Sequence, residues 1–234
     1  MAAKYFVTLD TETAGSFDDP RVYDLGWNIT DSKGAVVIER RYIIRETWEN
    51  AGLMGNAYYA DKIPTEYIPL INRGALRVVP LQAARLQLLS DLVEYQVNEI
   101  YAYNARFDQG ALDNTIKVLS NGYVTQFLPP TVCFKCIWGY AQDIVACTPK
   151  YVTWCLENGY LSEKGTPETS AEKMYRYLTG NAQFTEAHTA LEDVRIESYI
   201  LHHVRKHHGR KRGEWKSFSR WERLRQLRDE IIKG

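Results

Sequence analysis

Three apolar segments of strand length open the chain and constrain its fold more than any other feature. They span residues 4–10, 21–30 and 35–44. The second and third are separated by Asp-Ser-Lys-Gly at 31–34, residue types that β-hairpin turns favour. Strands that follow one another this closely predict a sheet that begins in hairpin order.

The rest of the chain changes from this pattern to an alternation of helix and strand. Residues 45–80 are irregular, with several prolines and glycines as breaks. The spacing of apolar residues then predicts a helix over 81–97, a strand over 99–103, a helix over 105–119 and a short strand near 131–134, ahead of a mainly helical region. This order predicts an α/β fold with a mixed sheet.

The composition is that of an ordinary globular protein, with 45% apolar and 25% charged residues among 234. No apolar run approaches the roughly 20 residues that span a bilayer, and the first residues carry no signal-peptide pattern. We therefore expect a soluble, cytoplasmic protein without membrane association. The four cysteines, at 133, 136, 147 and 155, are expected to be reduced core thiols, with metal or redox chemistry at the Cys133–Cys136 pair as the alternative.

Two carboxylates lie where the first predicted strand ends. Asp10 and Glu12 are two residues apart, so they project from the same side, about 7 Å apart along the strand. Two negative charges at the end of a central strand are costly unless a cation lies between them, and their hard oxygens suit Mg²⁺ or Mn²⁺. The alternative is a solvated loop in which Thr11 and Thr13 begin a turn.

A second motif with an acidic residue follows the strand predicted over 99–103. The strand leads into a turn at Asn104, and Asp108 lies in the first turns of the next helix. A carboxylate at that position can serve a functional site, or it can only stabilise the helix dipole.

A third pattern precedes the helix predicted near residue 190. His188 comes just before the helix, and Thr189 and Glu192 have the spacing of a capping box. Asp193 follows the histidine by five residues, so a helix start can hold both side chains within a few ångströms of each other. The alternative is a structural or solvent-exposed histidine.

Together the three patterns resemble the histidine-containing (DEDDh) branch of the DEDD superfamily of 3′–5′ exonucleases. That family includes the proofreading subunit of bacterial DNA polymerase III, ribonuclease T and oligoribonuclease. Its D-x-E-T motif is matched at 10–13, its N-x-x-F-D motif at 104–108 and its H-x-x-x-x-D motif at 188–193. The resemblance covers roughly residues 4–204 and implies a ribonuclease H-like fold, with a five-stranded mixed sheet flanked by helices.

The resemblance also implies roles for individual residues. Two Mg²⁺ or Mn²⁺ ions would be held by Asp10, Glu12, Asp108 and Asp193, and His188 would be the general base that activates water. The reaction would release nucleoside 5′-monophosphates from the 3′ end of single-stranded DNA or RNA. The residues expected to contact substrate near the metals are Thr11, Thr13, Gly15, Asn104 and Phe107, with core packing as the alternative for Phe107.

The charge is unevenly distributed although it sums to zero. Residues 202–234 hold 11 Lys and Arg against 4 Asp and Glu, and 217–233 fit an amphipathic helix. We assign 1–207 to an exonuclease domain and 208–234 to a basic linker and this helix. The helix could dock on the nuclease domain or bind a polymerase or other protein. Alternatively, the basic residues before it contact the substrate backbone: Arg205, Lys206, Arg210, Lys211 and Arg212.

The resulting hypothesis is a metal-dependent 3′–5′ exonuclease. One alternative is a nuclease for short oligonucleotides or nucleotide second messengers. Another is a binding module for nucleic acid or protein that keeps the fold without turnover, although the presence of all four acidic residues and the histidine argues against it. The choice between DNA and RNA, and the oligomeric state, stay open at this level.

Overall fold

The computed structural model describes residues 4–207 and 217–233, which form two compact units. Of these residues, the first unit comprises 4–135 and 187–195, and the second comprises 136–186, 196–207 and 217–233. Helix α9 (Ala190–His207) begins in the first unit and continues in the second. The predicted boundary between residues 207 and 208 adjoins a segment outside the described residues and stays a prediction.

The described residues form a mixed six-stranded sheet in the order β4-β3-β2-β1-β5-β6. The strands are β1 (Phe6–Ser16), β2 (Asp19–Thr30), β3 (Val36–Ile44), β4 (Arg77–Val79), β5 (Glu99–Ala102) and β6 (Cys133–Cys136). The pairs β1–β2 and β2–β3 are antiparallel, whereas β1–β5 and β3–β4 are parallel. The predicted mixed α/β sheet is confirmed, with six strands in place of five.

Two predictions about the strands are wrong. Strand β4 falls in the stretch expected to be irregular, because its three residues are too short for a periodic signal and are held by parallel pairing with β3. Strand β1 does not end at the carboxylates, because it stays paired with β2 as far as Ser16. Asp10 and Glu12 therefore lie inside a long strand, and the solvated-loop alternative is excluded.

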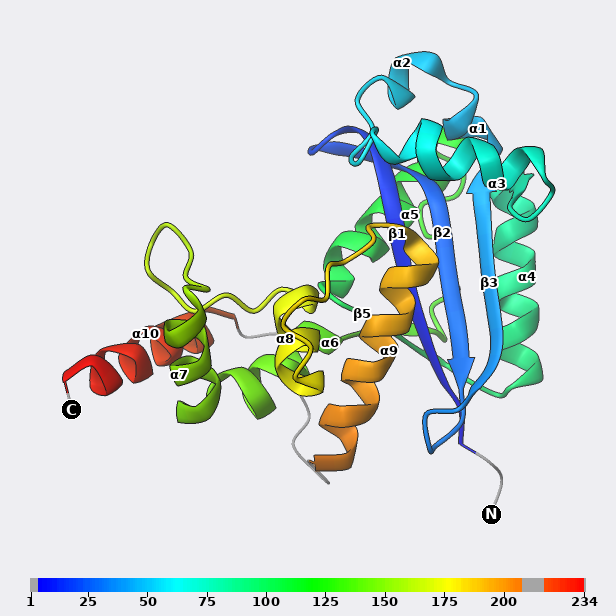
Figure 1. Cartoon of the computed structure of the whole chain (residues 1–234). Helices are drawn as coiled ribbons and strands as arrows, with labels where there is room; N and C mark the ends of the chain where they lie inside the picture. The colour runs from blue at the N-terminus through cyan, green and yellow to red at the C-terminus, as the bar shows by residue number, and fades with distance from the viewer. Residues whose placement is uncertain (1–3, 208–216, 234) are drawn as a thin grey trace. The chain divides into compact units, whose positions relative to one another are not determined.

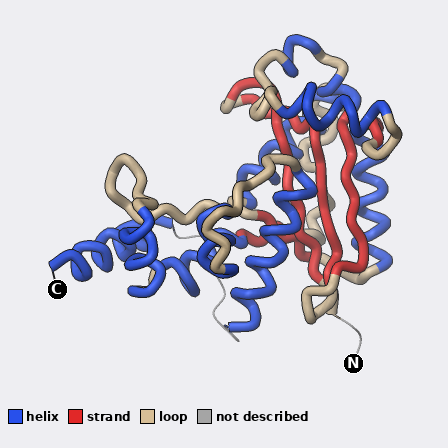
Figure 2. The backbone as a smooth tube through the Cα atoms, in the orientation of Figure 1, coloured by secondary structure: helices blue, strands red, loops and turns tan. Residues whose placement is uncertain are grey.

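Two helices cover one face of the sheet. They are α4 (Leu81–Glu94) and α5 (Ala105–Leu119), whose apolar side chains pack on Leu9, Leu25 and Trp27 of β1 and β2 in one buried cluster. Figure 2 shows β1, β2 and β3 side by side, and in Figure 1 short helices gather at the end of the sheet where β3 finishes. These are α1 (Arg45–Trp48), α2 (Ala51–Met54), the π-helical turn η1 (Ile63–Tyr67) and α3 (Ile68–Asn72).

The second unit is helical. Besides the rest of α9 it contains α6 (Ile137–Ala141), the π-helical turn η2 (Gln142–Ala146), α7 (Pro149–Asn158), α8 (Ala171–Thr179) and α10 (Ser217–Lys233). Within the described residues, no helix is both long and apolar enough to cross a bilayer.

Helix α10 confirms the helix predicted over 217–233 and packs on α7. It buries Leu224 and Leu227 completely or nearly so. Arg220 makes a bidentate ion pair with Asp143, with N–O distances of 2.5 and 2.8 Å. The apolar face of the helix is thus already used within the chain, and docking of a polymerase or other protein there stays a prediction.

The cysteines are all free thiols, as expected, but they do not share one environment. Cys155 is buried, Cys136 and Cys147 are half-buried, and Cys133 is exposed. The prediction of core thiols therefore holds for Cys155 and is wrong for Cys133.

Candidate metal centre

The face of β1 and β2 opposite α4 and α5 is polar. Strand side chains alternate between faces, so the residues between the core positions meet here in cross-strand pairs. These pairs are Thr8–Asn28, Asp10–Gly26 and Glu12–Asp24. A register shift between Glu12 and Thr13 interrupts the ladder just after the second carboxylate, as bulges near functional sites commonly do.

Three carboxylates converge on this face. One oxygen from each of Asp10, Glu12 and Asp193 lies within 4.8 Å of the other two. Glu12 and Asp193 are only 6% and 7% exposed, whereas Asp10 is half-buried. Negative charges brought this close together repel one another, a bound cation relieves the repulsion, and the hard oxygen donors of carboxylates fit Mg²⁺ or Mn²⁺. The residues present therefore fit a divalent metal, and three of the four predicted ligands are brought together.

Asp193 reaches this group because the start of α9 lies against β2. The backbone N–H of Ala190 donates a hydrogen bond to Asp24 Oδ2 at 3.2 Å. A Cβ atom on Gly26 would lie 2.7 Å from the carbonyl carbon of Ala190, which is too close for two carbon atoms. Only glycine therefore allows the backbone of α9 to approach β2 this closely. The predicted capping box does not form, since the buried Thr189 hydroxyl has no hydrogen-bond partner among the described residues.

Asp108 lies in the first turn of α5, as predicted, but not in the three-carboxylate group. Its carboxylate is 2% exposed and accepts a hydrogen bond of 2.9 Å from the Thr11 hydroxyl. Burial raises the pKa of the Asp108 carboxyl to about 7. The predicted turn before α5 is present, because Asn104 adopts a left-handed conformation with φ of 63°.

His188 lies next to an aromatic ring that sequence reasoning missed. The rings of His188 and Tyr59 are stacked, with 4.1 Å between centroids and 5° between planes. Both residues have positive φ, at 55° and 58°. Tyr59 is held near β1 because the N–H of Tyr58 donates to the Thr13 carbonyl at 3.0 Å. The only sequence signal was one tyrosine among sixteen, in a stretch without periodicity.

The predicted substrate-contacting residues near the carboxylates are placed as follows. Thr11 bonds to Asp108, the Thr13 carbonyl accepts from Tyr58, and Phe107 is half-buried. Gly15 has a φ of 94°, where a side chain is disfavoured, and an added Cβ would lie 2.9 Å from the Asp19 carbonyl oxygen. Contact of these residues and Asn104 with substrate stays a prediction.

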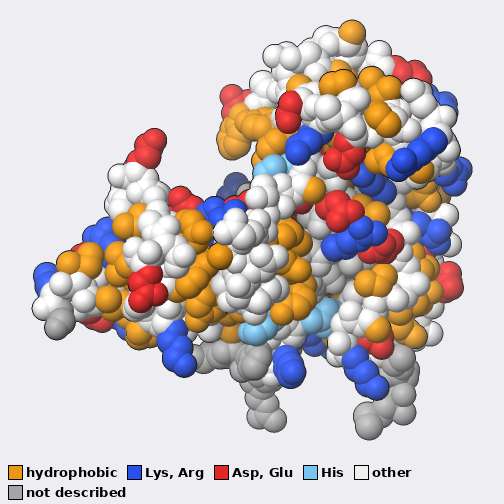
Figure 3. All heavy atoms as spheres, in the orientation of Figure 1, with side chains coloured by type: hydrophobic (Ala, Val, Ile, Leu, Met, Phe, Trp, Pro, Cys, Tyr) orange, Lys and Arg blue, Asp and Glu red, His pale blue; other side chains and the backbone are white. Residues whose placement is uncertain are grey.

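The basic residues predicted to contact the substrate backbone belong to other parts of the chain. Arg205 and Lys206 are exposed on the part of α9 that belongs to the second unit. Arg210, Lys211 and Arg212 lie outside the described residues. On the face that Figure 3 presents, acidic and basic side chains of the first unit are interspersed. A path for a nucleic-acid backbone therefore stays a prediction.

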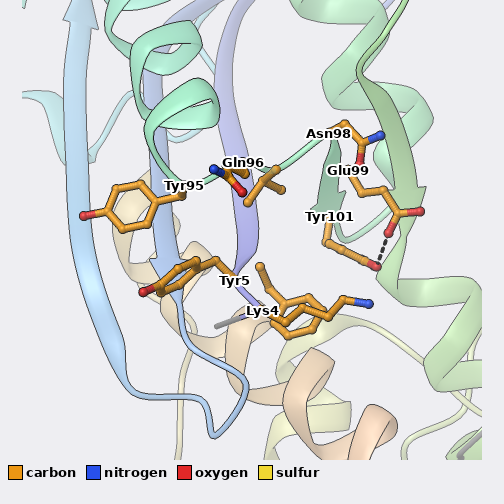
Figure 4. Close-up of a pocket in the computed structure, with 9 residues that line it drawn as sticks. Lys4, Tyr5, Tyr95, Gln96, Asn98, Glu99 and Tyr101 are labelled. Atoms are coloured by element: carbon orange, nitrogen blue, oxygen red, sulfur yellow. Dashed lines mark hydrogen bonds between the residues drawn. The ribbon is translucent and has the colours of Figure 1, made fainter. Parts of the chain in front are cut away.

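A separate pocket of about 400 Å³ lies at the other end of β1. It is lined by residues 4–6, 95–99 and Tyr101. Figure 4 shows Tyr5 and Tyr95 on one side, in edge-to-face contact at 5.0 Å, and the 2.8 Å hydrogen bond from the Tyr101 hydroxyl to Glu99 on the other. No predicted site residue lines this pocket, so it is distinct from the carboxylate group.

The chain is similar in structure to known nucleases. Escherichia coli exonuclease I, solved in complex with a 5cy-dT13 oligonucleotide, superposes with a TM-score of 0.57 and 16% identity over 98% of this chain. Cell-death related nuclease 4 (CRN-4) superposes with a TM-score of 0.54 and 12% identity over 88% of this chain. The chain spans only 43% of exonuclease I and 64% of the CRN-4 chain.

In sequence, the chain matches no protein-family model and no curated protein. At identities below 20%, the structural similarity establishes a shared fold. The predicted ribonuclease H-like α/β fold is therefore confirmed, and the carboxylates of β1 and α9 lie on a fold that known exonucleases share.

Proposed function

We propose that the chain is a metal-dependent 3′–5′ exonuclease that acts on single-stranded DNA or RNA and releases nucleoside 5′-monophosphates. The observation that carries the proposal is the convergence of Asp10, Glu12 and Asp193 within 4.8 Å on a fold shared with exonucleases. The solved exonuclease I complex with an oligonucleotide supports single-stranded nucleic acid as the substrate class.

In this proposal the chain's residues divide the work of hydrolysis. Asp10, Glu12, Asp193 and, from α5, Asp108 would hold two Mg²⁺ or Mn²⁺ ions. When bound, such ions neutralise charge on the scissile phosphate and lower the pKa of water. His188 takes the proton of the attacking water, for which an imidazole is suited near neutral pH. Tyr59, stacked on the imidazole, restricts the ring's orientation.

The test uses 5′-labelled single-stranded DNA and RNA of one sequence, with Mg²⁺, Mn²⁺ or EDTA. We expect ladders that shorten from the 3′ end, no products with EDTA, and no cleavage of circular single-stranded DNA. Loss of a residue that only orients a metal ligand typically costs 10–100-fold, so Asp10→Asn, which alters a proposed ligand itself, should slow hydrolysis at least about a hundredfold. Glu94→Gln, which removes an exposed carboxylate at the end of α4, should leave the rate unchanged.

Other outcomes would redirect the proposal. Intact polymers with either metal, but cleavage of di- to tetranucleotides, would indicate an enzyme for short substrates. Intact substrates of every length would indicate a binding module. Cleavage of the circle would show an endonuclease.

A further inference from the structure

We infer that Asp24 is a positioning residue, which holds the start of α9 and with it Asp193 and His188 over the carboxylates of β1. The inference rests on the proposed function of that site. Asp24 is the one acidic residue of the segment over 21–30 and belongs to none of the three motifs, so the sequence gives no sign of this role.

The Asp24 carboxylate is entirely buried and fully engaged. Its Oδ2 accepts hydrogen bonds from Arg41 Nη2 at 2.8 Å, from the Tyr67 hydroxyl at 2.9 Å and from the Ala190 N–H at 3.2 Å. Its Oδ1 accepts from Arg41 Nε at 3.1 Å. One side chain on β2 thus joins β3, the turn η1 and the first turn of α9, and Arg41 compensates its charge.

The position of Asp24 links it to the metal centre. It lies directly across from Glu12 in the β1–β2 ladder, and Gly26 lies across from Asp10. The two positions of β2 that face the two carboxylates of β1 are therefore the two that hold α9, one by a hydrogen bond and one by lacking a side chain. Ala190, which they hold, follows His188 by two residues and precedes Asp193 by three.

A second contact of the same helix is weaker. Arg195 pairs with Glu39 on β3 at 2.6 Å, but the arginine side chain is 44% exposed. Exposed ion pairs contribute little to holding an element in place. The buried Asp24 is therefore the stronger anchor for the first turn of α9.

The chain offers a matched control for Asp24. Asp91 on α4 is also buried, at 1% exposed, and it pairs with Arg40, the neighbour of Arg41 on β3. It also accepts a hydrogen bond from Trp27 Nε1 at 2.9 Å. Asp91 thus ties a helix to the same strands on the apolar face, through hydrogen bonds to Trp27, Arg40 and Gln87.

The experiment compares Asp24→Asn with Asp91→Asn in the full chain. Mn²⁺ affinity is measured from the electron paramagnetic resonance signal of the free ion, and thermal unfolding is followed without metal. We expect both variants to unfold at lower temperature. Only Asp24→Asn should weaken Mn²⁺ binding, by at least about tenfold, because residues that orient metal ligands have effects of this size.

Gly26→Ala provides a second variant that changes no charge. Its added methyl group would press on the backbone of Ala190 and Leu191, so it should also weaken Mn²⁺ binding. Wild-type affinity in both Asp24→Asn and Gly26→Ala, or equal weakening in Asp91→Asn, would overturn the positioning role. A wild-type chain that binds no Mn²⁺, or binds it equally well after Asp10→Asn, would instead overturn the proposed function and this inference with it.

Discussion

The two faces of β1 and β2 are made of alternate residues of the same strands, yet their side chains are buried by different interactions. On one face Leu9, Leu25 and Trp27 are fully buried in an apolar cluster with α4 and α5. On the other, Asp10, Glu12 and Asp24 are buried or half-buried carboxylates. Apolar burial is non-directional, whereas a buried carboxylate needs specific partners. The apolar face therefore stabilises the fold, whereas the polar face carries carboxylates whose burial costs stability unless they have partners.

The sharpest way to test this division is to truncate a core residue next to the site. Leu9→Ala should lower the free energy of unfolding by about 2–5 kcal/mol, because Leu9 is fully buried and its loss leaves a cavity. Denaturant titration measures the change. Mn²⁺ affinity of the folded protein should not change, since the side chain points away from the carboxylates.

Its neighbour on the other face supplies the control. Asp10→Asn should not lower stability in the absence of metal, because it removes one of several mutually repelling charges. If Leu9→Ala weakened Mn²⁺ binding as strongly as Asp10→Asn does, the two faces could not be treated as independent.

A smaller change in stability is expected when either of two buried threonines, which differ in their hydrogen bonding, is replaced by valine. Thr8 lies on the polar face, and its buried hydroxyl has no hydrogen-bond partner in the described part of the chain. Thr115 on α5 is equally buried, but its hydroxyl accepts from the Val22 N–H at 3.0 Å and donates to the Ala111 carbonyl. Thr115→Val should destabilise the protein by about 1–3 kcal/mol, because it leaves a buried N–H unsatisfied, whereas Thr8→Val should be neutral or stabilising.

Thermal and denaturant unfolding of the two valine variants decide this comparison. Destabilisation by Thr8→Val as large as that by Thr115→Val would show that the Thr8 hydroxyl is hydrogen-bonded, for example through buried water. The buried polar groups of this face would then have more hydrogen-bond partners than their direct contacts within the protein show.

The smallest effect concerns the stacked ring beside His188. Aromatic pairs contribute about 0.5–1.5 kcal/mol beyond their burial, so Tyr59→Ala should lower the rate constant of hydrolysis about two- to tenfold if the stack orients the imidazole. Single-turnover hydrolysis of labelled single-stranded DNA measures the change. Tyr59→Phe, which keeps the ring, should retain the wild-type rate, and an equal loss in both variants would assign the effect to the hydroxyl.

Much of the fold was predictable because it is encoded locally. The apolar spacing predicted α4 and α5, and the closely spaced apolar segments predicted the hairpin order of β1, β2 and β3. The end of β1 was not predictable, because Thr13 to Ser16 carry little strand pattern and are held by pairing with β2. Strand β4 was missed for the same reason, since three residues show no period.

The sequence by itself determined that Asp10, Glu12, Asp108 and Asp193 are candidate ligands, because each belongs to a short motif that can be recognised from its spacing along the chain. Only the tertiary structure decided that three of these converge while Asp108 bonds to Thr11, and that Asp24 and Tyr59 lie beside the site. The hydrogen bond from Ala190 to Asp24 joins residues 166 positions apart. Contacts over such distances depend on how the elements pack, which no local pattern of residues specifies.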